Sequence, residues 1–210
     1  MAAYNTKFAS IVTGASERQL RYWDRLGIIR PSVGAASGRG SRRLYSFFDL
    51  IQARAAKKLR DEGLSLQRLR QALHALKEKP EQVKHPLAEL TLITDGSTVF
   101  MLTDDRTALE DVLGRGQLVS ALAIKPLCDY VRQQVTRGTR KLRSTVEVAF
   151  RKYRVVIGPD VVDGGFIAEC PSLPGCLTDG ETQEEALCNI KDAIAIWREA
   201  GRRQRHAQAQ

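Results

Sequence analysis

The sequence predicts an α+β chain built from several small domains, because runs of helical pattern and runs of strand pattern occupy separate stretches of it and the charge changes sign between blocks. The first 80 of its 210 residues hold 16 Lys or Arg against 6 Asp or Glu, a net charge of +10, whereas residues 155–200 carry −7. A basic block suits a polyanion and an acidic block repels one. We therefore expect the two ends of the chain to have different partners.

The composition, 43% hydrophobic and 27% charged residues, is typical of a globular protein. No run approaches the roughly 20 apolar residues that a membrane helix needs, and no apolar signal segment follows Met1. The four cysteines match neither a zinc pattern nor a disulfide framework, so we expect small buried thiols in a reducing compartment. The prediction is a cytoplasmic, nucleoid-associated protein without membrane contact, metal or cofactor.

Two short helices joined by a glycine turn are expected at the start of the chain. The first spans residues 7–13 and is capped by Asn5 or Thr6. Gly14 supplies the turn, because a residue without a Cβ takes a positive φ readily, and Ser16 caps the second helix. Such a pair forms a helix-turn-helix unit, whose second helix enters the major groove of DNA.

A hairpin and two further helices complete the first block. Residues 28–31 and 42–45 are expected to form two strands, with the Gly-, Ser- and Ala-rich residues 32–41 as the tip of a wing. Ser46 carries a capping signal for a third helix, and Ser65 caps a fourth. The apolar positions expected to face the core are Phe8, Ala9, Val12, Leu20, Trp23, Phe48, Ile51, Ala55, Leu59, Leu66, Leu69, Leu73 and Leu76.

The second helix carries the strongest functional signal. Its polar residues are too numerous for all of them to face the core; they are Glu17, Arg18, Arg21, Tyr22 and Arg25. One interpretation is a solvated charged face. We favour DNA contact, because arginines with an interleaved tyrosine are the groups that reach phosphates and guanine edges.

The segments TGASERQLRYWDRLGIIRP and RRLYSFFDL resemble the N-terminal domain of the MerR family of regulators, over residues 4 to about 79. The resemblance implies a winged helix-turn-helix that binds double-stranded DNA. It implies backbone clamps at Arg21, Tyr22, Arg43 and Tyr45, residues near base edges at Ser16, Glu17 and Arg18, and wing contacts at Arg39 and Arg42. The family usually forms a dimer through a long helix after this domain. Pro80 and Pro86 interrupt any such helix here, so we expect a homodimer that is made differently.

The middle of the chain carries no recognisable chemistry. Strands are expected at 90–93, 98–102 and 117–124, with one or two helical turns over 106–113. We interpret residues 86–125 as a small α/β module for interaction or dimerisation. Residues 126–148 are predicted to form a basic linker helix, with a break at Gly138 as the alternative; for its arginine-rich second half the alternative is a second nucleic-acid contact.

The last block, residues 149–200, predicts a three-stranded sheet covered by one helix. The strands are expected at 153–157, 166–170 and 176–178, and Thr182 with Glu185 forms a capping box at the start of the helix. The apolar stripe expected to cover the sheet is Ala186, Ile190, Ala193 and Trp197, with Leu187 and Ile194 beside it. Residues 201–210 are expected to be a disordered tail.

The segment GGFIAECPSLPGCLTDGETQEEALCNIKDAI resembles the HicB-like antitoxin domain. That resemblance implies binding to a small, basic, RNA-cleaving toxin protein, and the acidic Glu169 and Asp179 are then the candidate partner-binding residues. The alternative is an acidic domain without such a partner.

Catalysis is not expected. Asp160, Asp163, Glu169 and Asp179 form an imaginable nuclease cluster, but three of them flank Gly or Pro turns, where Asp is favoured for local hydrogen bonding. The sequence therefore predicts a DNA-binding transcriptional regulator of bacterial type, whose operator binding is modulated through a C-terminal protein-binding domain. The alternative is a type II antitoxin of a toxin-antitoxin system, which masks its toxin and autoregulates its operon.

Overall fold

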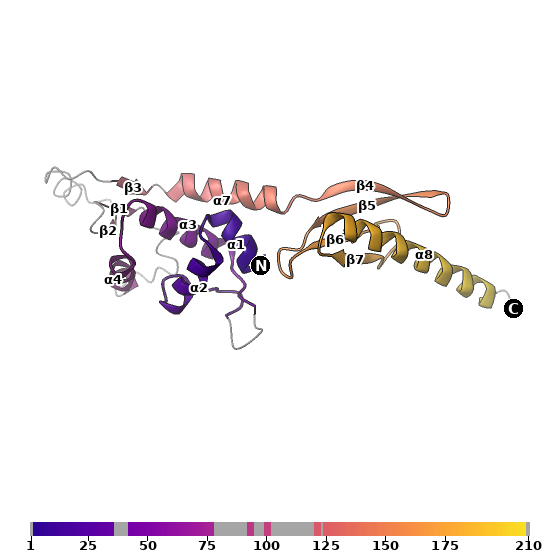
Figure 1. Cartoon of the computed structure of the whole chain (residues 1–210), viewed down its shortest axis with the longest axis horizontal. Coiled ribbons are helices and arrows are strands. Elements are labelled where there is room, and N and C mark those ends of the chain that lie inside the picture. Colours follow the sequence, from indigo (N-terminus) through magenta and orange to yellow (C-terminus); the bar gives the residue numbers. More distant parts are fainter. Residues whose placement is uncertain are drawn as a thin grey trace. The chain divides into compact units, whose positions relative to one another are not determined.

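The computed structural model describes residues 2–35, 42–77, 92–94, 99–101, 120–122 and 124–208. The chain divides into two compact units, Met1–Val135 and Thr136–Gln210, which are described separately below. Figure 1 shows the helices of the first unit and the sheet with its covering helix in the second. The multidomain α+β fold class is therefore confirmed.

The first two helices begin and end as their capping residues dictate. Helix α1 (Thr6–Thr13) starts where Phe8 N donates to Asn5 Oδ1 at 2.8 Å, and it ends at Gly14, with φ 73°. Helix α2 (Glu17–Arg25) starts with a full capping box between Ser16 and Gln19. The predicted core positions of both helices are buried: Phe8, Ala9, Val12, Leu20 and Trp23.

The wing begins later than the sequence pattern indicates. The expected strand at residues 28–31 is wrong, because Ile28 and Ile29 lie in a bend directly after α2 and are buried in the core. Pairing starts at Gly34, which bridges to Leu44 with backbone hydrogen bonds of 2.9 and 3.1 Å. The predicted tip contact Arg39 lies outside the described residues.

Helix α3 (Phe47–Asp61) and helix α4 (Leu66–Lys77) complete the domain. Ser65 caps α4 as predicted, since its hydroxyl accepts from Arg68 N at 3.2 Å. Phe48 was expected in the core but is 46% exposed. It is the second residue of α3 and lies outside the part of the helix that the core covers. The buried apolar positions of α3 are Leu50, Ile51, Ala53, Ala55, Ala56 and Leu59.

Three short strands form a small antiparallel sheet within the predicted middle module. They are β1 (Leu92–Thr94), β2 (Val99–Met101) and β3 (Ser120–Leu122), in the order β2-β1-β3. The helical turns expected at 106–113 lie outside the described residues.

Helix α7 (Ile124–Gly138) ends at the glycine where a break was the alternative. The helix predicted to continue to 148 is wrong, because residues 142–148 pair as a strand with residues 151–157. In the first unit α7 is held by the buried Val131 and by the Arg54 guanidinium, 4.4 Å from the centre of the Tyr130 ring.

The second unit has four strands, where three were expected. They are β4 (Leu142–Val148), β5 (Arg151–Pro159), β6 (Phe166–Glu169) and β7 (Leu177–Gly180), antiparallel in the order β4-β5-β6-β7. Helix α8 (Gln183–Gln208) covers one face. The expected disordered tail is also wrong, because the helix runs on to Gln208.

The core of the second unit lies between the sheet and α8. It comprises Val146, Val155, Ile157, Ala168, Cys170, Leu173, Cys176, Ala186, Ile190 and Ile194. Trp197 was expected to end this apolar stripe but is 41% exposed, and its indole N–H donates to Pro174 O at 3.3 Å. The core therefore ends at Ile194, one helical turn earlier.

Two cysteines depart from the expectation of buried thiols. Cys170 and Cys176 are buried as predicted, whereas Cys128 is half-buried and Cys188 is exposed; all four are free thiols. Cys188 lies on the outer side of α8, away from the buried stripe. In the described parts of the chain, no helix has the length and apolar character to cross a membrane.

Candidate nucleic-acid interface

The polar side of α2 is held outward by its apolar side. Leu20 and Trp23 are buried in the first unit, which fixes the rotation of the helix about its axis. As a result Arg18, Arg21 and Tyr22 are exposed, Tyr22 to 43%. These are three of the four predicted contact positions of the helix, and all three are accessible to a large ligand; the fourth, Glu17, is half-buried.

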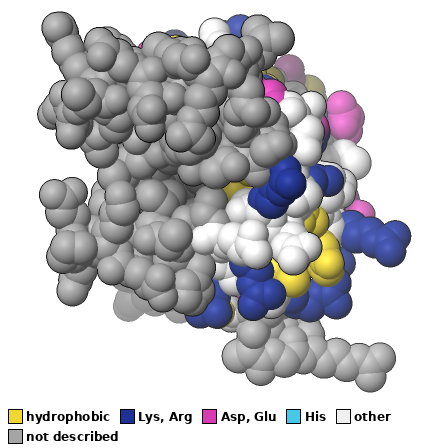
Figure 2. Space-filling model, turned by 90° about the vertical axis from the view of Figure 1, so that its left-hand side faces the viewer, with side chains coloured by type: hydrophobic (Ala, Val, Ile, Leu, Met, Phe, Trp, Pro, Cys, Tyr) yellow, Lys and Arg dark blue, Asp and Glu magenta, His cyan; other side chains and the backbone are white. Residues whose placement is uncertain are grey.

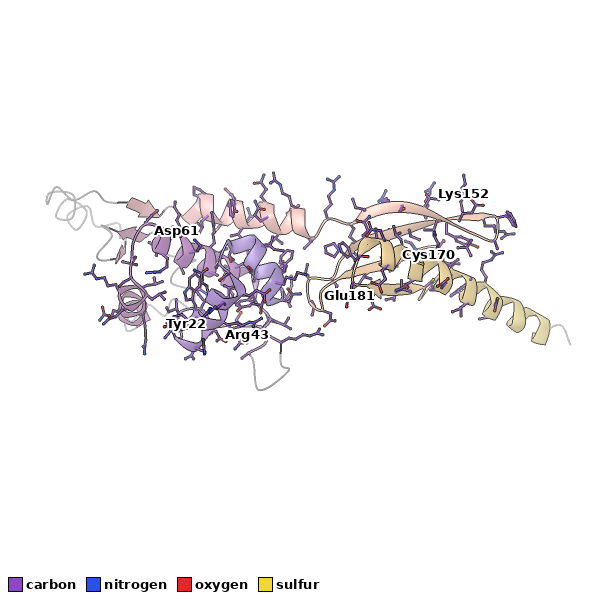
Figure 3. All side chains as sticks on the ribbon, viewed as in Figure 1. Tyr22, Arg43, Asp61, Lys152, Cys170 and Glu181 are labelled. Atoms are coloured by element: carbon purple, nitrogen blue, oxygen red, sulfur yellow. The ribbon has the colours of Figure 1, made fainter. Side chains whose placement is uncertain are left out.

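A groove of about 560 Å³ joins the helix to the wing. Its lining residues are Glu17, Arg18, Arg21, Arg25 and Arg43. Four come from α2, and Arg43 comes from the strand that returns from the wing, so the fold brings together residues 18 or more positions apart. In Figure 3, Tyr22 and Arg43 lie on the same side of the first unit.

Local interactions hold the arginines in place. Arg21 forms an ion pair with Glu17, N to O 2.8 Å, one helical turn away. The Arg25 guanidinium lies 5.6 Å from the centre of the Tyr22 ring, a cation–π contact. Four guanidinium groups and one carboxylate leave the groove strongly positive.

Arg43 is held more tightly than the other arginines. Its Nε donates to Asp24 Oδ2 at 2.7 Å, and both side chains are about four-fifths buried. This ion pair links the wing to α2. Arg43 therefore lines the groove while it is paired with Asp24.

A buried carboxylate, Asp49, fixes the base of the wing. Its Oδ2 accepts from Ser32 N at 2.8 Å, from Ser32 Oγ at 2.7 Å and from Ser46 N at 2.8 Å. Ser32 starts the wing, Ser46 follows its return strand, and Asp49 lies in the first turn of α3. One carboxylate therefore sets both ends of the wing relative to the helices.

Tyr45 differs in position from the other predicted contacts. It is fully buried, and its backbone pairs with Tyr4 at 2.8 and 3.0 Å. Burial, with the nearby charge of Asp24, raises the pKa of Tyr45 to about 12. Its phenol is a core group in this structure, so we leave Tyr45 out of the proposed contact surface.

The remaining predicted residues are placed as follows. Ser16 is exposed, but its hydroxyl caps α2 by accepting from Gln19 N. Arg42 is exposed at the wing. Glu169 and Asp179 are exposed on β6 and β7 of the second unit.

Asp49 supports the interface but was not among the residues predicted to contact DNA. Arg25, one of the polar residues of α2 for which DNA contact was favoured, lines the groove one turn after Arg21. In the sequence Asp49 was recognised only as part of the capping signal of the third helix. Its hydrogen bonds to Ser32 join residues 17 positions apart in the chain, and local sequence patterns do not reveal such pairs.

In Figure 2, Lys and Arg side chains cover much of the described part of the face shown, while Asp and Glu lie toward its edge.

Comparison with known proteins supports a two-part chain. Residues 4–76 match the family model described as MerR HTH family regulatory protein. Uncharacterized HTH-type transcriptional regulators of Mycobacterium bovis and Mycobacterium tuberculosis are 37% identical over 124 residues, 59% of this chain and 53% of theirs. The chain thus spans about half the length of these curated relatives.

A second kind of relative is shorter. The UPF0150 protein Ta0767 of Thermoplasma acidophilum is 49% identical over 49 residues, 23% of this chain and 70% of that protein. A further relative is again named as a regulator: the heavy metal-dependent transcription regulator 1 of Rhizobium meliloti is 31% identical over 65 residues, 31% of this chain and 42% of that protein. The chain therefore combines an N-terminal MerR-family helix-turn-helix domain with a C-terminal segment of the UPF0150 family.

Proposed function

We propose that the chain is a transcriptional regulator that binds duplex DNA through the groove between α2 and the wing. The observation that carries this proposal is the convergence of four arginines, from two separate elements, on one exposed surface. Guanidinium groups bind phosphates and guanine edges in a bidentate manner. The named relatives that are transcriptional regulators support the same reading.

Within the groove the arginines have different roles. Arg18 lies in the first turn of α2, the part of a recognition helix that meets base edges. Arg21 lies one turn further along α2, toward Asp24, which pairs with the wing residue Arg43, and we assign Arg21 to the phosphate backbone. We expect two copies of the chain to bind an inverted repeat, since recognition helices of a dimer reach major-groove faces about 34 Å apart.

Alanine substitutions in the full chain separate these roles. Arg21→Ala should weaken binding to all duplexes by a similar factor, whereas Arg18→Ala should reduce discrimination at one base position by about 1–3 kcal/mol. Affinities for single-base variants of a selected duplex measure both effects. Arg70→Ala is the control, because Arg70 is exposed on α4 outside the groove.

Two results would contradict the proposal. If both groove variants keep the base preference of the wild type, Arg18 does not contact base edges. If the affinity does not change with salt concentration, the arginines do not contact phosphates, since each such contact releases counterions.

We propose further that a protein partner modulates DNA binding through the side of the sheet that α8 leaves open. Glu169 and Asp179 are exposed there, on the adjacent strands β6 and β7. Their charge suits a basic partner, and in the alternative function, an antitoxin, this partner is a small toxin. Glu169→Lys with Asp179→Lys should abolish rescue from such a toxin without weakening DNA binding; loss of DNA binding instead would count against separate functions.

A further inference from the structure

The β4–β5 hairpin is basic, whereas residues 160–200, which follow it, carry 9 Asp or Glu against 2 Lys or Arg. Between residues 142 and 159 the hairpin carries Arg143, Arg151, Lys152 and Arg154 against the single acid Glu147. The strand β6 pairs only with residues 156–159 of β5, while β4 pairs with β5 along its whole length. The hairpin therefore extends beyond the sheet as a two-stranded ribbon, as Figure 1 shows.

The two faces of this ribbon differ. Val146 and Val155 are buried toward α8. Because side chains alternate along a strand, the neighbouring positions face the open side. The cross-strand pairs on that side are Arg143 with Val156, Thr145 with Arg154, and Glu147 with Lys152. Figure 3 shows Lys152 on the side of the hairpin away from α8.

A groove of about 680 Å³ lies along the open face. Arg143 and Arg154 line it, together with the hydroxyl-bearing Thr145 and Ser172. Both arginines are exposed, and neither forms an ion pair with another residue that the structure describes. Two free guanidinium groups beside hydroxyl donors are the groups that bind phosphodiester oxygens.

The tip of the ribbon presents an aromatic ring. Phe150 is 98% exposed, and Ala149 and Phe150 have φ of 47° and 62°, in the left-handed region. Two-residue hairpin turns with both φ values positive usually contain Asn or Gly, so the ring stands at a position where a small residue fits more easily. An aromatic side chain at the end of a basic ribbon can stack on bases or enter a groove between base steps.

We propose that the open face of the β4–β5 hairpin is a second DNA-binding surface, with Arg143, Lys152 and Arg154 on the phosphate backbone and Phe150 against bases. This proposal rests on the DNA binding proposed for the groove beside α2. Once that groove is occupied, the hairpin meets the same duplex at a high effective concentration. Basic residues on an edge hairpin also prevent strand-to-strand aggregation, but that role requires neither a groove lined by two arginines nor an exposed phenylalanine.

The test measures binding of the full chain to a duplex of about 60 base pairs over a range of salt concentrations. The variant Arg143→Gln, Lys152→Gln, Arg154→Gln should bind at least about tenfold more weakly. Its slope of log affinity against log salt should fall by about 2 to 3, the loss expected for three phosphate contacts. Phe150→Ala should weaken binding by a few-fold at an unchanged slope, because the ring carries no charge.

The matched control removes the same charge from the same unit. Lys191→Gln, Arg202→Gln, Arg203→Gln replaces three basic residues of α8, and it should change affinity by less than about threefold. Glu147→Gln should strengthen binding, because it removes the one acid of the hairpin. A weaker or unchanged affinity for Glu147→Gln, or equal effects of the two triple variants, would overturn the proposal.

Two further outcomes identify a different failure. If the hairpin variant loses affinity for a single-stranded RNA of the same length but keeps its affinity for the duplex, the surface binds RNA and the duplex proposal is wrong. If Arg18→Ala with Arg21→Ala leaves duplex binding intact while the hairpin variant loses it, the function proposed for the α2 groove fails and the hairpin surface stands.

Discussion

Replacing Asp49 with alanine removes the acceptor that ties both ends of the wing to α3. Three hydrogen bonds of 2.7–2.8 Å end on one oxygen of this buried carboxylate. A hydrogen bond to a charged group contributes about 1.5–3 kcal/mol, but water replaces the acceptor for the exposed Ser32. Ser46 N is buried and stays unsatisfied. We therefore expect Asp49→Ala to lower the free energy of unfolding of the first unit by about 2–4 kcal/mol.

The two tryptophans make the measurement specific. Trp23 lies in the core of the first unit, and Trp197 is a partly exposed residue of the second unit. In a Trp197→Phe background the tryptophan fluorescence, followed during urea unfolding, therefore reports on the first unit alone. Asp61→Ala is the control on the same helix, because its ion pair with Lys57 is at the surface and contributes less than about 1 kcal/mol. Duplex affinity should fall for Asp49→Ala at temperatures where the unit remains folded. A stability within about 0.5 kcal/mol of wild type would refute the role of this carboxylate.

Three other predictions follow from single features. Burial raises the pKa of Tyr45 from 10.0 to about 12, so the unfolded chain loses this proton at a lower pH than the folded chain does. The contribution of Tyr45 to the free energy of unfolding should therefore be fully present below pH 10 and should decline between pH 10 and pH 12. Tyr45→Phe should flatten this decline in urea titrations. Trp197→Ala should cost at most about 1 kcal/mol, since the ring is partly exposed, whereas Ile194→Ala should cost about 2–5 kcal/mol; equal losses would place Trp197 in the core after all. A chain that ends at Gly138, before β4, should keep its α2 groove and bind short duplexes, but it should lose the affinity gained on longer ones; unchanged binding to long duplexes would show that the second unit adds nothing.

Elements with strong local signals were predicted from the sequence. Asn5, Ser16 and Ser46 each place a hydrogen-bond acceptor before an apolar helical repeat, and the structure starts a helix after each. The same holds for the glycine turn at Gly14. Capping and turn geometry depend on neighbours within four positions, so the information is contained in a short stretch of sequence.

Element ends and exposed aromatics were predicted less well. Trp197 and Phe48 both stand on apolar stripes, yet both lie beyond the part of the core that their helices cover. A stripe gives the direction that a side chain faces, but the length of the covering surface is set by other elements. The strand β4 was missed for a related reason, because Arg143 fitted the arginine-rich end of a predicted helix and only pairing with β5 makes this segment a strand.

The sequence by itself determined the helix-turn-helix, the basic side of α2 and the order of strands and helix in the last block, because each follows from local spacing and charge. Only the tertiary structure decided that Arg43 joins the α2 arginines, that Asp49 holds the wing, that Tyr45 is a core group, and that Arg143 and Arg154 share one groove. These relations join residues that are distant in the chain, and such contacts exist only after the apolar faces have packed and fixed the elements relative to one another.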